Sequence, residues 1–71
     1  MIAKFELTRP IEARKLNPRT LRPVTNQWVA IPFGAILTLI EQDDERVHFS
    51  YLGEPYRTPV SDFKEAARPL G

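Results

Sequence analysis

The residues with the clearest chemical potential in this chain are basic and lie close together near its start. Five of them fall within residues 9–22, with a single acid among them: Arg9, Arg14, Lys15, Arg19 and Arg22. Lys and Arg make most contacts to nucleic-acid backbones, so this segment is a candidate phosphate-binding arm. Aromatic side chains, which single-strand binders use to stack bases, are absent from residues 9–27. We therefore favour an arm that is solvated or contacts an acidic partner, and keep nucleic acid as the alternative.

Aromatic residues complete the candidate binding surface. Trp28 is the sole tryptophan, and tryptophan side chains often anchor interfaces. We favour the other interpretation, in which Trp28 belongs to the core or to the mouth of a barrel. Tyr51 and Tyr56, with Phe63, are the remaining aromatic candidates for a binding groove.

Nothing in the chain predicts catalysis, a metal site or a cofactor. There is no cysteine, and His48 is the only histidine, which excludes thiolate zinc and multi-histidine sites. The acidic run at residues 43–45 lacks the spaced ligands and the glycine of a calcium loop, so it favours a solvated turn. Ser61 and Asp62 invite comparison with a catalytic triad, but a nearby helix start explains Ser61 equally well. We predict a protein that is not an enzyme.

Length and charge indicate one small domain with two unlike halves. Seventy-one residues leave room for a single hydrophobic core, and the net charge is +1. Residues 1–30 carry six bases and two acids, a net of +4, whereas residues 31–71 carry four bases and seven acids, a net of −3. This asymmetry predicts that copies of the chain self-associate.

The distribution of apolar residues predicts a cytoplasmic protein with no membrane partner. The longest nearly apolar run, residues 28–40, is thirteen residues long, and a membrane span needs roughly 18 or more. The first residues carry Lys4 and Glu6 where a signal peptide requires an apolar stretch. The lack of cysteine fits a reducing compartment.

Apolar periodicity predicts a mostly β protein. Residues 3–7 and, most clearly, residues 46–52 alternate with the period of a strand that buries one face. Residues 35–40 are apolar without alternation, which predicts a strand buried on both faces. The charged residues 42–45 predict a hairpin tip between these last two strands.

The segment 9–27 is interrupted by proline and polar residues and predicts an irregular basic arm. Asn17-Pro18 favours a turn, and the polar residues 25–27 favour another, with short extended pieces between them. After this arm, Pro32 and Gly34 suit the second and fourth positions of a type I turn.

The end of the chain predicts a short helical segment over residues 58–68. Thr58 before Pro59 is typical of a helix start, with threonine as the N-cap and proline at the first helical position. Apolar residues then follow at helical spacing and form one stripe: Val60, Phe63 and Ala67. Pro69 ends the helix, because its ring disfavours a helical residue before it.

Two stretches resemble the SH3-like domains of bacteria. Residues 31–37 are similar to the apolar–turn–glycine entry of those domains, and residues 56–63 resemble their ending, where a short 3₁₀ turn joins the last two strands. The resemblance covers about residues 31–65. It implies a small SH3-like barrel of five to six short strands with a short C-terminal helix or 3₁₀ turn, as a single domain over residues 1–71.

The departures from this family lie where SH3 domains bind proline-rich peptides. Those domains carry an Ala-Leu-Tyr-Asp-Tyr-like first strand and paired tryptophans after the second hairpin, and this chain has residues 3–7 (AKFEL) and 47–49 (VHF) there. Without that aromatic groove, polyproline recognition is disfavoured. The sequence predicts a binding or assembly module whose partner is a protein, including a second copy of itself. The alternative is a nucleic-acid-binding barrel that uses the basic arm, residues 9–22.

The same patterns predict which side chains form the core. The expected set consists of the inward-facing apolar residues of the predicted strands and helix: Phe5, Leu7, Ile36, Leu37, Leu39, Val47, Phe49, Tyr51 and Phe63.

Overall fold

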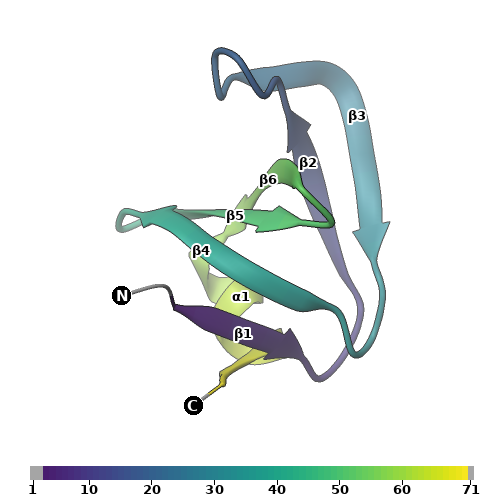
Figure 1. Cartoon of the computed structure of the whole chain (residues 1–71), viewed down its shortest axis with the longest axis vertical. Coiled ribbons are helices and arrows are strands. Elements are labelled where there is room, and N and C mark those ends of the chain that lie inside the picture. Colours follow the sequence, from purple (N-terminus) through teal and green to yellow (C-terminus); the bar gives the residue numbers. More distant parts are fainter. Residues whose placement is uncertain (1–2, 71) are drawn as a thin grey trace.

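The chain folds into one antiparallel sheet and one short helix (Figure 1). The computed structural model describes residues 3–70, without the side chains of residues 25 and 26. Along the chain the elements are β1 (Lys4–Leu7), β2 (Ile11–Leu16), β3 (Pro23–Ile31), β4 (Ile36–Gln42), β5 (Arg46–Tyr51), β6 (Glu54–Pro59), α1 (Val60–Ala66) and β7 (Ala67–Pro69). The prediction of a mostly β protein is confirmed.

The sheet is open, with strand order β3-β2-β6-β5-β4-β1-β7 and antiparallel pairing throughout. Within residues 3–70, β3 and β7 each pair on one side only, so the sheet does not close on itself. The structure therefore has more strands than the five to six expected, and it has two sheet edges. The sheet curls so that α1 contacts β6, β2, β5 and β7.

The core lies between the curled sheet and α1. Phe63 of α1 packs edge-on against Phe5 of β1, with ring centroids 5.0 Å apart, and lies 6.2 Å from the ring of Phe49 on β5. Tyr56 of β6 stacks on Phe49 at 5.9 Å. The buried apolar side chains are Leu7, Ile11, Ala13, Leu16, Ile31, Ala35, Leu37, Val47, Phe49, Tyr56, Phe63 and Ala66.

Most of the predicted core residues are in this set: Leu7, Leu37, Val47, Phe49 and Phe63. Three others are half-buried and pack against it: Phe5, Leu39 and Tyr51. The alternation predicted for residues 46–52 is confirmed, because Val47 and Phe49 are fully buried while Arg46 is exposed.

The prediction that residues 35–40 form a strand buried on both faces is wrong. On β4, Leu37 is buried, whereas Ile36 and Ile40 are exposed. An apolar run cannot by itself distinguish a strand covered on two faces from one covered on a single face. The assignment of Ile36 to the core fails for the same reason.

The segment 9–27 is more regular than the predicted arm. Its apolar residues are buried on β2, which lies between β3 and β6 in the sheet: Ile11, Ala13 and Leu16. The irregular part is the turn over residues 17–22, and residues 25–27, predicted as a turn, lie inside β3. The residues that flank them, Pro23 and Trp28, pair with Leu16 and Arg14 of β2, and the register of β2 with β3 shifts between these two pairs.

The turn between β3 and β4 is shifted by one residue from its prediction. The backbone N–H of Ala35 donates to the carbonyl of Pro32 at 3.2 Å, so Pro32 is the first residue of the turn and Gly34 the third. Gly34 has φ +82°, the value that the third position of a type II turn requires. The predicted type I turn is therefore wrong.

The C-terminal helix begins later than the predicted segment 58–68. Thr58 belongs to β6, is fully buried, and its hydroxyl donates to the carbonyl of Glu12 at 3.3 Å. It is not the N-cap, because α1 begins at Val60 after Pro59 and has no side-chain cap. After Ala66 the chain becomes extended again as β7, a strand that the sequence did not predict.

No helix within residues 3–70 has the length and apolar character needed to cross a membrane.

Candidate functional site

One face of the sheet gathers basic residues and tryptophan in a row that crosses four strands. Trp28 of β3 pairs with Arg14 of β2, Arg14 pairs with Arg57 of β6, and Arg57 pairs with His48 of β5. Residues directly opposite each other on neighbouring strands share a face. The row therefore places three cationic or titratable side chains and one indole side by side on the sheet.

Arg46 joins this row from the next position on the same face of β5. It lies two residues before His48 and pairs with Pro59 of β6, and side chains two residues apart on a strand share a face. A half-open pocket of about 190 Å³ lies here, lined by Arg14, Trp28, Arg46, Arg57, Thr58 and Pro59. We call Arg14, Trp28, Arg46 and Arg57 the arginine–tryptophan face.

Arg14 makes the closest connection between the charges and the indole. Its guanidinium lies 5.6 Å from the ring centroid of Trp28, within the range of a cation–π contact. The Nε of Arg14 is buried and has no hydrogen-bond partner within the described residues. Buried donors are usually hydrogen-bonded, so Arg14 Nε is an exception among the described residues.

The three arginines repel one another. Burial, followed by the charges of Arg46 and Arg14, lowers the pKa of Arg57 below its ordinary value. The ion pairs found among the described residues lie elsewhere and join Arg9 to Glu65 and Arg68 to Glu6. The face therefore concentrates positive charge without a carboxylate bound to it.

The acidic hairpin tip between β4 and β5 acts on this face through Asp43, whose charge works against the lowering of the Arg57 pKa. Asp43 Oδ1 accepts the backbone N–H groups of Glu45 at 2.7 Å and Arg46 at 2.8 Å. These two hydrogen bonds lower the pKa of Asp43 below its ordinary value. The predicted solvated tip at residues 42–45 is confirmed, since all four residues are exposed.

The described residues contain no cluster of three or more His, Cys, Asp or Glu arranged to hold a metal ion.

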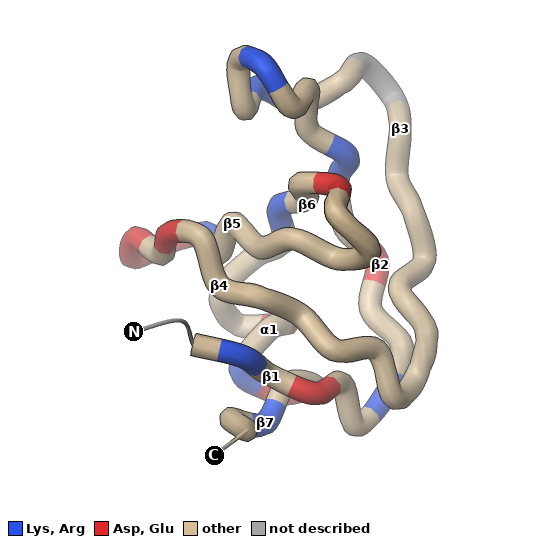
Figure 2. Tube along the Cα trace, in the orientation of Figure 1, with Lys and Arg blue, Asp and Glu red and all other residues tan. Residues whose placement is uncertain are grey.

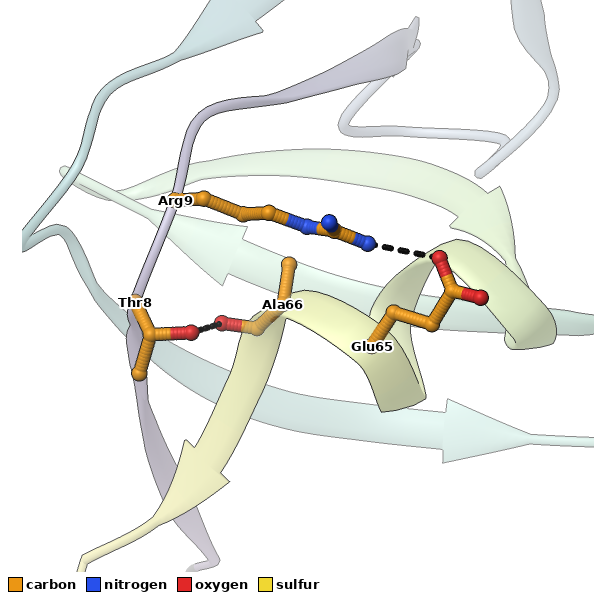
Figure 3. Close-up of polar contacts among 4 residues, drawn as sticks. All are labelled: Thr8, Arg9, Glu65 and Ala66. Carbon is orange, nitrogen blue, oxygen red and sulfur yellow. Dashed lines mark hydrogen bonds and ion pairs between the residues drawn. The ribbon is translucent and has the colours of Figure 1, made fainter.

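The structure separates the basic residues of the predicted arm into different environments. Arg9 is held by Glu65 of α1 at 2.6 Å, beside Thr8, whose hydroxyl donates to the carbonyl of Ala66 at 2.9 Å (Figure 3). Arg9 thus fixes the end of the helix to the start of β2. It does not belong to the arginine–tryptophan face.

Arg19 and Arg22 lie on the turn that joins β2 and β3. Asn17 Oδ1 accepts the backbone N–H of Arg19 at 2.8 Å, and both arginines are exposed. Lys15 is half-buried on β2 and pairs with Tyr56. Figure 2 shows basic positions on β2 and β6 close together, further basic positions at the β2–β3 turn, and acidic positions at the β4–β5 tip.

Two aromatic candidates lie in environments opposite to those expected, because Trp28 is exposed and Tyr56 is buried. Trp28 is 55% exposed, so its assignment to the core is wrong. Tyr56 is buried and stacks on Phe49, so it supports the core and is unavailable to a ligand. Tyr51 is half-buried against the core.

Sequence reasoning missed Arg46 and Arg57 as site residues. The sequence contains part of this information, because Arg46 and His48 alternate with the buried residues Val47 and Phe49 and therefore lie on the opposite face of the strand. Strand alternation alone gives the face of β5 on which Arg46 lies. It does not say which strand lies beside β5. Only the registers of β2 with β6 and of β5 with β6 bring Arg14, Arg46 and Arg57 together.

A second, larger hollow of about 450 Å³ has mixed charge and is a weaker candidate. It is lined by Arg9, Pro10, Ile11, Glu12 and Asp62. Its single base, Arg9, is already paired with Glu65. The two acids there give the hollow no affinity for an anion.

Comparison with known proteins gives no relative. No protein-family profile, no curated protein and no solved structure matches the chain. The functional assignment therefore rests on the residues of this chain alone.

Proposed function

We propose that this protein is a non-enzymatic binding module with an SH3-like arrangement of strands, and that it binds nucleic acid on the arginine–tryptophan face. The observation that carries this proposal is the meeting of three arginines and an exposed tryptophan around one small pocket, with no carboxylate bound to them.

The strand connections support the SH3-like part of the proposal. The meander β4-β5-β6 is followed by α1, and β7 then returns to pair with β1. A short helical turn likewise joins the last two strands of SH3 domains. The β2–β3 hairpin occupies the position of the first long loop in those domains.

The size of the pocket favours a group projecting from a polymer over a substrate enclosed by an active site. Sites that bury a small molecule usually measure roughly 300–1,000 Å³, and this pocket measures about 190 Å³. A phosphate group of a longer chain needs only such a shallow cradle. Arg is well suited to hold it, because its planar guanidinium donates two parallel hydrogen bonds to phosphate oxygens.

The lack of an ion pair to these arginines among the described residues also supports an anionic ligand, although the charge of Asp43 offsets part of their repulsion. Arg14, Arg46 and Arg57 repel one another, so their clustering does not stabilise the fold. A polyanion bound here relieves this repulsion. The net charge of +1 is far below that of strongly basic nucleic-acid-binding domains, so we expect weak binding that does not depend on base sequence.

The test is fluorescence anisotropy with labelled random DNA and RNA oligonucleotides across a series of salt concentrations. We expect dissociation constants in the range typical of non-specific binding, about 1–100 µM, with affinity falling as salt rises. The triple variant Arg14→Gln, Arg46→Gln, Arg57→Gln should lower the log–log salt slope by about 2, because each phosphate contact contributes about 0.7 for single strands.

A charge-matched control separates this face from general attraction. The triple variant Arg9→Gln, Lys64→Gln, Arg68→Gln loses the same charge from exposed positions outside the face. Its salt slope should stay close to that of the parent protein. Equal losses in the two triple variants, or no binding at about 100 µM protein in low salt, would contradict the proposal.

A second candidate function is self-association through the edge of the sheet, as the unlike halves of the sequence predict. The observation in its favour is β3, nine residues long, which pairs only with β2 within the described part of the chain. A long unpaired edge is a template for another strand. Sedimentation velocity over a range of protein and salt concentrations tests it: dimers that weaken with added salt support this role, and a strict monomer at high concentration and low salt removes it.

A further inference from the structure

The arginine–tryptophan face also specifies the form of nucleic acid that it accepts. Resting on the proposed function, we propose that the ligand is single-stranded, with one base stacked on the free face of Trp28 and the adjoining phosphates held by Arg14, Arg57 and Arg46. The geometry of the indole and the direction of the row carry this inference.

Trp28 is placed to stack a base. One side of its ring receives the guanidinium of Arg14 at 5.6 Å, and 55% of the residue remains exposed. A base can therefore lie on the side of the indole that faces away from Arg14. Every base has a π-face, so such stacking tolerates any sequence.

The arginines continue from Trp28 in a line across the sheet. Neighbouring strands are about 4.8 Å apart, so Arg14 lies one strand spacing from Trp28, and Arg57 lies two. Arg46 borders the same pocket one step along the strands. A strand of nucleic acid that crosses the sheet in this direction passes from Trp28 to the arginines that border the pocket.

A duplex does not fit this arrangement. Inside a duplex both faces of each base are covered by neighbouring bases, so the indole could stack only on a terminal base pair. Duplex readers instead insert a helix or a two-stranded ribbon into the major groove. The helix α1 is seven residues long and carries Asp62 and Glu65, which repel phosphate. Among the described hairpin turns, the β2–β3 turn is the one that carries basic residues, Arg19 and Arg22, so duplex binding would depend on that turn and not on Trp28.

The fluorescence of Trp28 gives a direct readout, since it is the only tryptophan. The probes are an unlabelled single-stranded DNA of about ten nucleotides, within the site sizes of roughly 4–16 nucleotides of OB folds, the matching duplex, and an abasic strand of equal length. The abasic strand presents the same phosphates without bases. We expect the base-bearing strand to quench Trp28 and to bind more tightly than either the duplex or the abasic strand.

Substitution of Trp28 separates stacking from charge. Trp28→Ala should weaken binding of the base-bearing strand by about 5- to 150-fold, the range that corresponds to losing one base–aromatic stack. It should leave abasic-strand binding unchanged, and Trp28→Phe should retain part of the affinity. Because Trp28 is exposed, both variants should keep the far-UV circular dichroism of the parent protein.

The results distinguish this inference from the proposed function. If Trp28→Ala has no effect, or if the duplex or the abasic strand binds as tightly as the base-bearing strand, the single-strand inference is overturned. In that case, loss of binding in the Arg14, Arg46, Arg57 triple variant would still uphold nucleic-acid binding by charge. If none of the three probes binds, both proposals fall.

Discussion

Replacement of Phe49 by alanine is expected to remove a large part of the stability of this protein. Phe49 is fully buried and its ring lies 5.9 Å from Tyr56 and 6.2 Å from Phe63, so it links β5, β6 and α1. Phe→Ala in a core costs about 3–5 kcal/mol. A chain of 71 residues has a free energy of unfolding of only about 4–11 kcal/mol, at roughly 0.05–0.15 kcal/mol per residue. Chemical denaturation followed by circular dichroism measures the loss.

Phe33 provides the matched control for this substitution. It lies in the turn between β3 and β4 and is 71% exposed. Phe33→Ala deletes the same atoms from a solvated position, so stability should change by about 0.5 kcal/mol or less. If Phe49→Ala unfolds cooperatively with a stability near that of the parent protein, the register of β5 in the core is wrong.

The second large effect is expected at Leu16, within the segment that resembles a basic arm in the sequence. Leu16 is fully buried at the end of β2. Leu→Ala in a core costs about 2–5 kcal/mol, with a term that grows with the cavity left behind. We therefore expect Leu16→Ala to lower the denaturation midpoint strongly, measured by the same method.

Leu52 gives the comparison for Leu16. It is 83% exposed in the tight turn between β5 and β6, and Leu52→Ala should leave the midpoint almost unchanged. Similar small effects at Leu16 and Leu52 would mean that residues 9–27 form a detached arm, contrary to the structure. A large effect at Leu16 alone places β2 inside the folding unit.

The sequence allowed prediction of those strands whose burial follows a simple period. Val47 and Phe49 alternate with polar residues, and the acidic hairpin tip before them is exposed to solvent, as its charged residues predict. Phe5 and Leu7 follow the same rule on β1, where Leu7 is fully buried. In these places the local pattern and the tertiary structure agree.

The prediction failed where pairing between distant strands decides the outcome. Residues 25–27 favour a turn by their own chemistry, yet they continue β3, where the flanking residues Trp28 and Pro23 pair with Arg14 and Leu16 of β2. Threonine is a residue type typical of a helix N-cap, but Thr58 lies in β6, where its hydroxyl donates a hydrogen bond to the carbonyl of Glu12. In both cases, a long-range contact replaces the local preference.

The candidate site could be predicted only in part for the same reason. The basic residues of the segment 9–22 and Trp28 were identified, but the segment was treated as one unit. Arg14 and Arg57 are 43 positions apart and become neighbours through the register of β2 with β6. Alternation gives the face of a strand on which a residue lies, but it gives no information about which strand lies beside it.

The most direct test of the arginine–tryptophan face is a nuclear magnetic resonance titration of the parent protein with the single-stranded oligonucleotide. The single indole N–H of Trp28 and the Nε–H groups of Arg14, Arg46 and Arg57 report on the face itself. The account predicts that these signals, together with backbone amides near them on β2, β3, β5 and β6, shift most as the strand is added. It is contradicted if the face stays unperturbed while the largest shifts fall on the β2–β3 turn or on β1 and β7, or if no signal moves at about 100 µM ligand in low salt.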